Sequence, residues 1–403
     1  MSKAIGVFKE VRFKKNTGAW GALAGASGGT KLRRTSADFN PSADVYSSNE
    51  INPSFQVTDT RLGVRGAEGS LNGELSPGTY SQFMGSVMGK DFAAVVGASG
   101  VSVTIATSGT NFTITRAAGS WITDGIRVGQ VVRMTGAGLN AANVGNNCFV
   151  MSMTATVLTV KVLSGVALVA EGPIAAVAVA PVGKVSYIPA TGHTNDDYNI
   201  EEWHSDVAQS MLYTGMKVGT VNVQLPSTGI ITTDFSFMGK GLMQKGVSAY
   251  FTSPSAATTT GLLTAVQGAL LINGVEGACI TDANITIERT MEAAQCVGSN
   301  YNSDIFVGKI NVSGSLSAYF SDAAMLDYFN NETNVSIAIA ATTGTAKNAD
   351  VISFVIPFAK FTSFANADSE TGIVSSLDFT GIMNTSTSTG LIDSTIMIQD
   401  SAA

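Results

Sequence analysis

The sequence predicts a mainly β protein with two tandem β-sandwich or barrel folds, each with a short flanking α-helix, and a small inserted all-β domain. Three observations lead to this prediction. A strand with strict two-residue alternation precedes a short amphipathic helix, the same pair recurs later in the chain, and a segment of short strands interrupts the first copy. The 403 residues, 45% of them hydrophobic, and the 43 glycines suit a large, loop-rich β protein.

The first strand and helix lie at 65–88. In the middle of RGAEGSLNGELSPGTY (65–80), at 67–76, small and apolar residues at odd positions alternate with Glu, Ser and Asn at even positions, which predicts one apolar and one wet face. Ser76 and Pro77 look like an N-cap and first helical residue, and Gly89 like the end of the helix. The helix places its aromatic and methionine side chains at core spacing: Tyr80, Phe83, Met84, Val87 and Met88.

A second copy of this unit begins about 241 residues later, in FVGKINVSGSLSAYFSDAAMLDYF (306–329). The alignment matches Gly73 with Gly314 and Leu75 with Leu316, and it predicts a second helix capped by Ser321. That helix is expected to bury Ala324, Met325, Tyr328 and Phe329. A further pair of similar strands, TGIITTDFSFMG (228–239) and TGIVSSLDFTG (371–381), supports a duplicated fold.

This organisation divides the chain into three parts. We expect a discontinuous first domain at 1–91 and 191–245, with a basic N-terminal arm at 1–34. The inserted small β domain occupies 92–190, where short Val- and Thr-rich strands are separated by turn signals. The second domain spans 246–403.

Charge is segregated along the chain. The net charge is −7, yet the residues up to Arg34 carry eight cations against the single acid Glu10. A basic arm on an acidic body suits docking on the acidic surface of a neighbouring copy, while an ordinary solvated strand and a nucleic-acid arm are alternatives. The candidate inter-subunit or inter-ring contacts are Lys3, Lys9, Arg12, Lys14, Lys15, Arg33 and Arg34.

The sequence shows none of the usual catalytic motifs, so we expect no enzyme activity, no cofactor and no metal. Nucleotide-binding and nucleophile-elbow motifs are missing from the sequence, and it has only two histidines. The stretch GHTNDDYNIEEWH (192–204) could be read as a divalent-metal loop, although a solvated acidic loop before a strand fits its spacing better. The three cysteines, Cys148, Cys279 and Cys296, suit buried free thiols, with a Cys279–Cys296 disulfide as the alternative.

The low charged fraction suits a protein whose surface is largely buried in an assembly. Only 13% of the residues are charged, against roughly 25% in ordinary domains. The sequence lacks an apolar run long enough to span a membrane, and MSKAIGVFKEVRFKK (1–15) lacks the apolar core of a signal peptide. We therefore expect a protein without membrane contact that is made outside the secretory pathway.

Several motifs together resemble the tail tube proteins of long-tailed, siphovirus-like bacteriophages. They occur in the order RTS, Q-x-x-D-x-R, G-x-x-x-G and TG-x-x-x-x-x-F-x-FMGK, within about 20–91 and 198–245. The inserted domain at 92–190 has no counterpart in the minimal family pattern.

The resemblance implies a structural virion protein of a non-contractile tail. It implies two tandem tail-tube folds whose inner strands join those of neighbouring subunits into a barrel around a channel for double-stranded DNA. Stacked rings, assembled in the host cytoplasm, would form the virion tail, with a tape measure protein and tail terminator or tip proteins as partners. A subunit with two such folds is expected to close as a trimer with pseudo-sixfold symmetry, although a hexamer remains open.

The wet face of the repeated strands would then line the channel, where small acidic residues repel DNA rather than retain it. Plain solvent exposure of this face is the competing interpretation, and Lys309 departs from the acidic pattern. The candidate lumen-facing residues are Glu68, Ser70, Asn72, Glu74, Asp234, Lys309, Asn311, Ser313 and Ser315. The insert is expected on the outer surface. A capsid or head-decoration protein and a surface-binding β-sandwich adhesin are the alternative functions.

Overall fold

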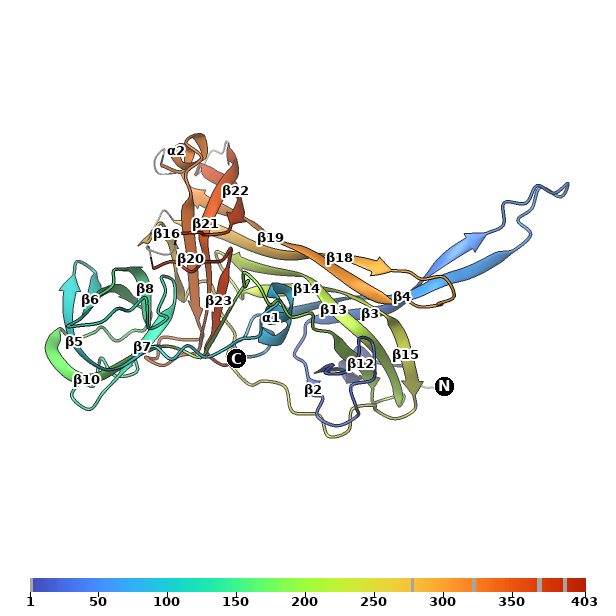
Figure 1. Cartoon of the computed structure of the whole chain (residues 1–403), viewed down its shortest axis with the longest axis horizontal. Helices are drawn as coiled ribbons and strands as arrows, with labels where there is room; N and C mark the ends of the chain where they lie inside the picture. The colour runs from blue at the N-terminus through green and yellow to red at the C-terminus, as the bar shows by residue number, and fades with distance from the viewer. Residues whose placement is uncertain (1–2, 277–278, 321–323, 368–371, 387–389) are drawn as a thin grey trace.

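The computed structural model describes residues 3–276, 279–320, 324–367, 372–386 and 390–403. The protein is mainly β, as predicted: within these residues, seventeen strands form one continuous hydrogen-bonded sheet, and a separate closed barrel hangs beside it (Figure 1). None of the described helices is long and apolar enough to cross a membrane.

The first repeat of the main sheet is built from segments on both sides of the barrel. A 3₁₀ turn, η1 (Gly6–Phe8), precedes it. Its elements are β1 (Lys9–Lys15), β2 (Thr30–Lys31), β3 (Ser36–Ser47), β4 (Thr60–Glu74), α1 (Ser81–Met88), β12 (Tyr198–His204), β13 (Gln209–Pro226), β14 (Thr232–Gly239) and β15 (Gly241–Gly246).

The second repeat follows without interruption. Its elements are β16 (Gly268–Ile272), β17 (Val275–Glu276), β18 (Ile280–Ala294), β19 (Asp304–Tyr319), α2 (Ala324–Asn330), β20 (Val335–Thr342), β21 (Val351–Asn366), β22 (Val374–Ile382) and β23 (Met397–Asp400).

The closed barrel has strand order β10-β5-β6-β9-β8-β7 and its own core around Trp121. Its strands are β5 (Ala98–Ser108), β6 (Asn111–Arg116), β7 (Val131–Thr135), β8 (Cys148–Met153), β9 (Val157–Val162) and β10 (Glu171–Pro181). A short strand, β11 (Lys184–Tyr187), then leaves the barrel and pairs with β23 of the second repeat. A further apolar cluster joins the barrel to the second repeat through Phe149, Met151, Val355 and Met397.

The two repeats correspond element by element and down to their irregularities. A β-bulge interrupts the β13–β14 ladder between Val218 and Thr220, and a bulge interrupts β21–β22 at the matching place, between Phe361 and Ser363. The β3–β4 and β18–β19 ladders share a second bulge, and β12–β13 and β20–β21 share a third. Because a bulge marks a specific position in a ladder, these matches fix the alignment of the repeats.

The structural alignment differs from the one expected from the sequence. Leu71 lies opposite Phe235, and its counterpart Leu316 lies opposite Leu377. Gly314 therefore corresponds to Gly69, whereas the sequence alignment matched it with Gly73. The shift is four residues, an even number, so both alignments keep the same residues on the same face of the strand.

A single apolar core runs behind both repeats. The apolar faces of β4, β13, β14, β18 and β19 belong to one buried cluster, together with Phe83 and Met84 of α1. Phe83 packs edge-on against Tyr198, Phe235 and Phe237, with ring centroids 5.0 to 5.7 Å apart. The helix thus seals the first repeat from behind.

The start of α1 differs from the prediction. Ser76 and Pro77 belong to a turn, in which the Thr79 backbone N–H donates to Ser76 O and the two side-chain hydroxyls lie 2.7 Å apart. The helix begins at Ser81, and Gly89 ends it in the left-handed conformation, as predicted.

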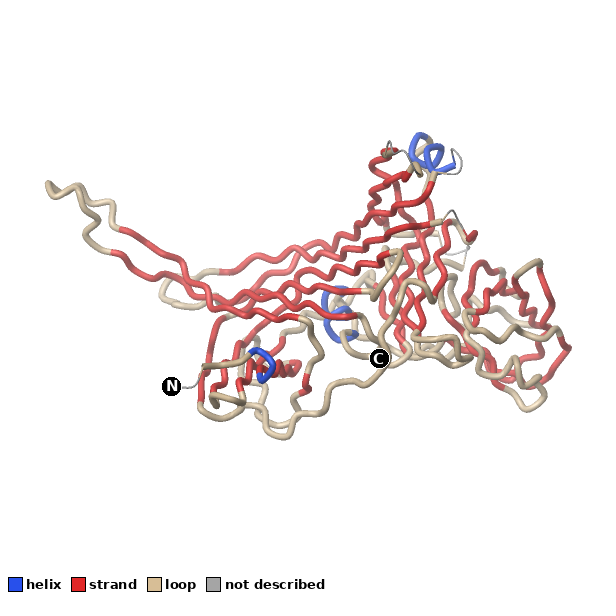
Figure 2. Tube along the Cα trace, turned by 180° about the vertical axis from the view of Figure 1, so that it is seen from behind, coloured by secondary structure: helices blue, strands red, loops and turns tan. Residues whose placement is uncertain are grey.

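The second helix forms, but it is less buried than predicted. Met325, Tyr328 and Phe329 pack only partly against the core, and Ala324 is exposed. The predicted cap, Ser321, lies outside the described residues. A long β3–β4 hairpin projects beyond the body, seen from both sides in Figures 1 and 2.

Candidate functional site

The feature common to both repeats is one polar sheet face. The strands pair in the order β3-β4-β14-β13-β18-β19-β22-β21, so the first repeat joins the second through β13 and β18. Alternation sends apolar residues to the core and polar residues to the other side on each strand.

Cross-strand pairing aligns these polar residues in three rows, which we call the polar face. The first row is Ser36, Asn72, Asp234, Asn222, Thr286, Ser313 and Thr380. The second row is Asp38, Ser70, Ser236, Thr220, Glu288 and Asn311. The third row is Glu74, Thr232, Gln224, Asn284, Ser315, Asp378 and Ser363. Every one of these residues is exposed or half-buried.

Hydrogen bonds along the first row cross the junction between the repeats. With the Asn72 amide turned so that both ends meet compatible partners, its N–H donates to Asp234 (3.1 Å) and its oxygen accepts from Ser36 (2.9 Å). Asn222 donates to Asp234 at 3.5 Å, and the Thr286 hydroxyl donates to Asn222 at 3.3 Å. The polar face is therefore one surface rather than two separate ones.

The polar face is acidic. It holds the carboxylates of Asp38, Glu74, Asp234, Glu288 and Asp378, and Glu68 stands beside its second row on β4. Lys309 lies on the same side of β19 as Asn311.

The predicted lumen residues all lie on this surface or its continuation along β4 and β19. Glu68, Ser70, Lys309, Asn311 and Ser313 are exposed, whereas Asn72, Glu74, Asp234 and Ser315 are half-buried. Sequence reasoning missed the contributions of β3, β13, β18 and β22, although DANITIE (282–288) shows the same alternation. Whether this surface lines a channel stays a prediction.

The two ends of the eight-strand order are unpaired edges. In the described part of the chain, β3 pairs with β4 alone, and residues 360–366 of β21 pair with β22 alone. Their counterparts inside the sheet are paired on both sides, since β18 lies between β13 and β19. Exposed edges of this kind favour pairing with another chain.

The basic N-terminal segment has its ionic partners within the chain. β1 pairs with β12, which brings Lys9 to 2.6 Å from Glu202 and Arg12 to 3.7 Å from the buried Glu201. Arg12 also pairs with Glu10 at 2.6 Å. The interpretation of 192–204 as a solvated loop was wrong for Glu201 and Glu202, which lie in a strand and are buried.

The other cations of the N-terminal segment, apart from Lys3, also have partners within the chain. Lys15 pairs with Asp91 and Asp196 at 2.9 and 2.8 Å. Lys14, Arg33 and Arg34 donate to the backbone oxygens of Ser27, Thr260 and Lys9. Lys3 is exposed. Contacts of these residues with a neighbouring copy stay a prediction.

Two of these ion-paired residues, Glu10 and Lys15, have shifted pKa values. Burial opposes the charged forms of Glu10 and Lys15, but hydrogen bonds from Lys31 and Arg12 lower the pKa of Glu10. Hydrogen bonds to Asp196 and Asp91 likewise raise the pKa of Lys15. Burial raises the pKa of Asp197, beside this cluster.

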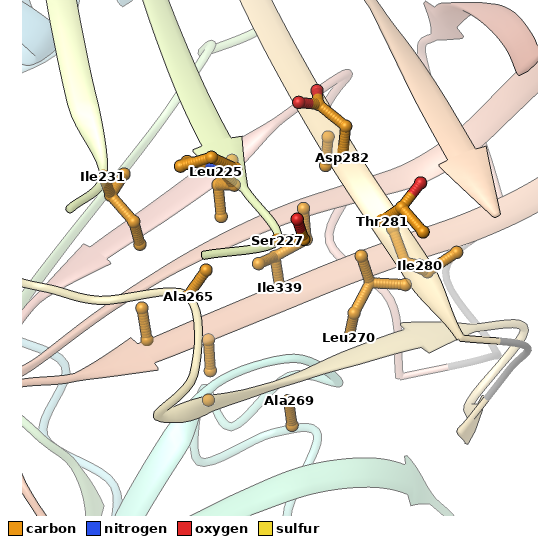
Figure 3. A pocket seen from close by; sticks show the side chains of 15 residues that line it. Leu225, Ser227, Ile231, Ala265, Ala269, Leu270, Ile280, Thr281, Asp282 and Ile339 are labelled. Atoms are coloured by element: carbon orange, nitrogen blue, oxygen red, sulfur yellow. The ribbon is translucent and has the colours of Figure 1, made fainter. Parts of the chain in front are cut away.

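A pocket of about 140 Å³ lies where the two repeats meet, between the end of β13 and strands β16, β18 and β20 (Figure 3). Its walls are mainly aliphatic, with Leu225, Ile231 and Leu270 among them, and its ionisable member is Asp282. Among the described residues, we find no group of three or more His, Cys, Asp or Glu side chains that could hold a metal ion. Cys148 is buried and free, and Cys279 and Cys296 are exposed and free, so they form no disulfide with each other.

Comparison with known proteins assigns the family. No curated protein sequence matches the chain. The family model described as phage tail tube protein matches residues 5–381, which includes both repeats up to β22 and the barrel between them. With nearly its whole length matched, the chain belongs to the phage tail tube proteins, structural proteins of the virion tail that assemble into a tube.

Proposed function

We propose that this chain is the major tail tube subunit of a non-contractile tail, and that its polar face lines the channel through which double-stranded DNA passes. The observation that carries this proposal is the continuity of the polar face: one acidic, hydrogen-bonded surface crosses both repeats and ends at two unpaired edges. Joining such edges between copies closes a sheet into a barrel and removes them.

The chemistry of the polar face suits passage rather than retention of DNA. DNA carries one negative charge per about 1.7 Å, and a basic wall would hold it through counterion release. Carboxylates such as Glu68 and Glu288 repel the phosphates instead, while hydroxyl and amide groups keep the surface hydrated. Lys309 would add one local attraction without reversing the sign of the wall.

A ring of three chains follows from the duplication. Each chain supplies two quasi-equivalent four-strand units, so three chains give the six units of a pseudo-sixfold ring. A ring of six chains would need twelve units around a much wider channel.

The barrel and the projecting hairpin would serve the outside of the ring and the contacts between rings. The apolar cluster that joins the barrel to the second repeat includes β16, β20, β23 and residues 351–355 of β21, whereas the polar face uses residue 363, farther along β21, which supports a place on the outer surface. The hairpin tip exposes Ile51 and Phe55 fully, which suits contact with another subunit. Lys3 and the other N-terminal cations are further candidates for such contacts. A tape measure protein is the expected partner inside the tube, and terminator or tip proteins are the expected partners at its ends.

Electron microscopy of the polymerised protein tests the proposal. We expect hollow rods whose end-on projections show six equivalent units, with the polar face, including Asn72 and Ser313, toward the lumen. Density that places Asn72 and Ser313 on the outside of the particle would overturn the lumen assignment, and twelve units around the ring would overturn the trimer.

A further inference from the structure

We infer that the junction between the two repeats is the template for the contact between chains: β3 of a second copy pairs with β21 in the register of β13–β18, and this copy covers α2. The inference rests on the proposed ring. It adds the register of the contact, the residues that meet and the role of the second helix.

The internal junction is a regular antiparallel ladder. Thr220 lies opposite Glu288, Val221 opposite Ile287, and Val223 opposite Ile285. Val221, Val223, Ile285 and Ile287 are each at most 1% exposed, so the two repeats share a dry core at this line.

The shared bulges translate this register to the open edges. The bulges align Thr220 of β13 with Ser363 of β21, and Glu288 of β18 with Ser42 of β3. Thr220 lies opposite Glu288 at the internal junction. In a contact between copies, Ser363 therefore lies opposite Ser42 of the second copy. The neighbouring pairs are Phe364 with Pro41, Ala365 with Asn40, and Asn366 with Phe39.

The two helices differ in how well they are buried in the single chain. α1 packs on β13 of its own repeat and on β18 of the next one, and Arg289 donates from β18 to the Ser86 carbonyl (3.2 Å). All residues of α1 except Gln82 are buried. α2 packs on β21 in the same way, yet none of its described residues is buried. Among the residues that the structure describes, α2 thus lacks a counterpart of the packing of α1 on β18, and β3 of a second copy would supply it.

Exposed apolar residues flank both edges. Near α2 and β22 lie Phe320, Ile373 and Ile382, and on the β3–β4 hairpin lie Val45 and Leu62. Within the chain, Met291 covers the bulge at Gly219. Its counterpart on β3 is Val45, and the counterpart of Gly219 is Thr362. The contact between copies therefore places Val45 over Thr362, as Met291 lies over Gly219 within the chain.

Disulfide trapping tests the register. In a Cys279→Ser, Cys296→Ser background, which retains the buried Cys148, Ser42→Cys with Ser363→Cys should crosslink on mild oxidation of polymers. Directly opposite residues have Cβ atoms about 4.5 to 5.5 Å apart, close to disulfide spacing. Positions 42 and 363 lie on opposite edges of one chain's sheet, so a crosslink needs a second copy. The largest covalent species should be a trimer.

The matched control moves one cysteine by two residues along the same face. Ser42→Cys with Ala365→Cys makes a diagonal pair, about 7 to 8 Å apart in the proposed register, and should crosslink poorly. If tubes form but only the control pair crosslinks, or neither pair does, the register is wrong while the tube assignment stands. If the wild-type protein forms no hollow polymer under the conditions used for the crosslinking variants, the proposed function itself fails.

A charge on α2 tests the covered helix separately. Met325→Asp should lower the melting temperature of the unassembled chain only slightly, because Met325 packs only partly against the core there. It should raise the protein concentration needed for polymerisation by about tenfold or more, since assembly would bury an unpaired carboxylate. Asn330→Asp adds the same charge at an exposed helix position and should polymerise normally. Normal polymerisation of Met325→Asp would overturn the role of α2.

Discussion

Gly314 on β19 lies directly opposite Phe379 on β22, and the Phe379 ring occupies the space that a side chain at position 314 would need. A methyl group there would lie 2.5 Å from Phe379 Cζ and would overlap the Asn284 backbone oxygen. The glycine therefore lets the aromatic residue of β22 cross over its neighbouring strand. The second repeat depends on this close approach for its packing.

We expect Gly314→Ala to destabilise the protein by about 1 to 3 kcal/mol, because overpacking a dense core forces side chains and backbone to shift. Chemical denaturation with tryptophan fluorescence would measure the loss. Gly308→Ala on the same strand is the control, since its methyl group would meet Thr290 Cβ at 3.4 Å. Equal effects of the two substitutions would contradict the packing argument.

The stability of the fold should also depend strongly on Glu201 of β12. Its carboxylate is fully buried, accepts from the Ser210 hydroxyl at 2.6 Å and from the backbone N–H groups of Tyr250 and Phe251, and lies near Arg12. Glu201→Gln keeps the shape but removes the charge and turns one acceptor into a donor. We expect a loss of about 2 to 4 kcal/mol, as for breaking a buried charge network. Glu50 is exposed, so Glu50→Gln should change the free energy of unfolding little. If Glu50→Gln and Glu201→Gln cost the same, burial of Glu201 is not the reason for its effect.

Asp400 on β23 predicts a pH dependence. Burial raises the pKa of its carboxyl from 3.8 to about 6, although the carboxylate accepts from the Ala402 and Gly78 backbone N–H groups at 2.9 and 2.8 Å. The folded state thus favours the protonated form, so this contribution to stability is present below pH 3.8 and is lost as the pH rises through about 6.

Asp400→Asn should therefore become more stable relative to wild type between pH 4 and pH 7, by about 2 kcal/mol, because each pKa unit corresponds to about 1.4 kcal/mol. Denaturation midpoints measured across this range for both proteins give the difference directly. Exposed Asp393→Asn is the control and should track the wild type. A pH-independent difference for Asp400→Asn would rule out the raised pKa as its cause.

The sequence predicts the strands of this fold well and their alignment poorly, for a physical reason. Alternation at Ala67, Gly69 and Leu71 reports which face is buried, and that face is the one observed. A slip by four residues leaves the alternation unchanged, so Gly314 could be matched with Gly73 as easily as with Gly69. Only the bulges separate these alignments, and bulges depend on strand pairing that a single sequence does not display.

Buried charges were missed for a related reason. In YNIEEWH (198–204), five consecutive residues are buried, so the strand lacks the alternation that marks a half-buried one. The two glutamates are tolerated there because β1 brings Lys9 and Arg12 beside them from a segment far away in the sequence. The charge segregation was visible in the sequence. The pairing between its two parts was not.

A cation placed on the polar face reports whether this surface lines the channel. Ser70→Lys places a cation at an exposed position in the second polar row, while Thr107→Lys makes the same change on exposed β5 of the barrel. If the polar face lines the channel, Ser70→Lys tubes should keep their shape but retain short double-stranded DNA that enters them, because lysines bind phosphates with release of counterions. The retained fraction should fall steeply with salt concentration, and Thr107→Lys tubes should show outer-surface binding that nuclease removes. DNA protected from nuclease only in the Ser70→Lys tubes would support the lumen assignment. Equal nuclease sensitivity in the two variants would place Ser70 outside the channel, because a wall contact is shielded and a surface contact is not.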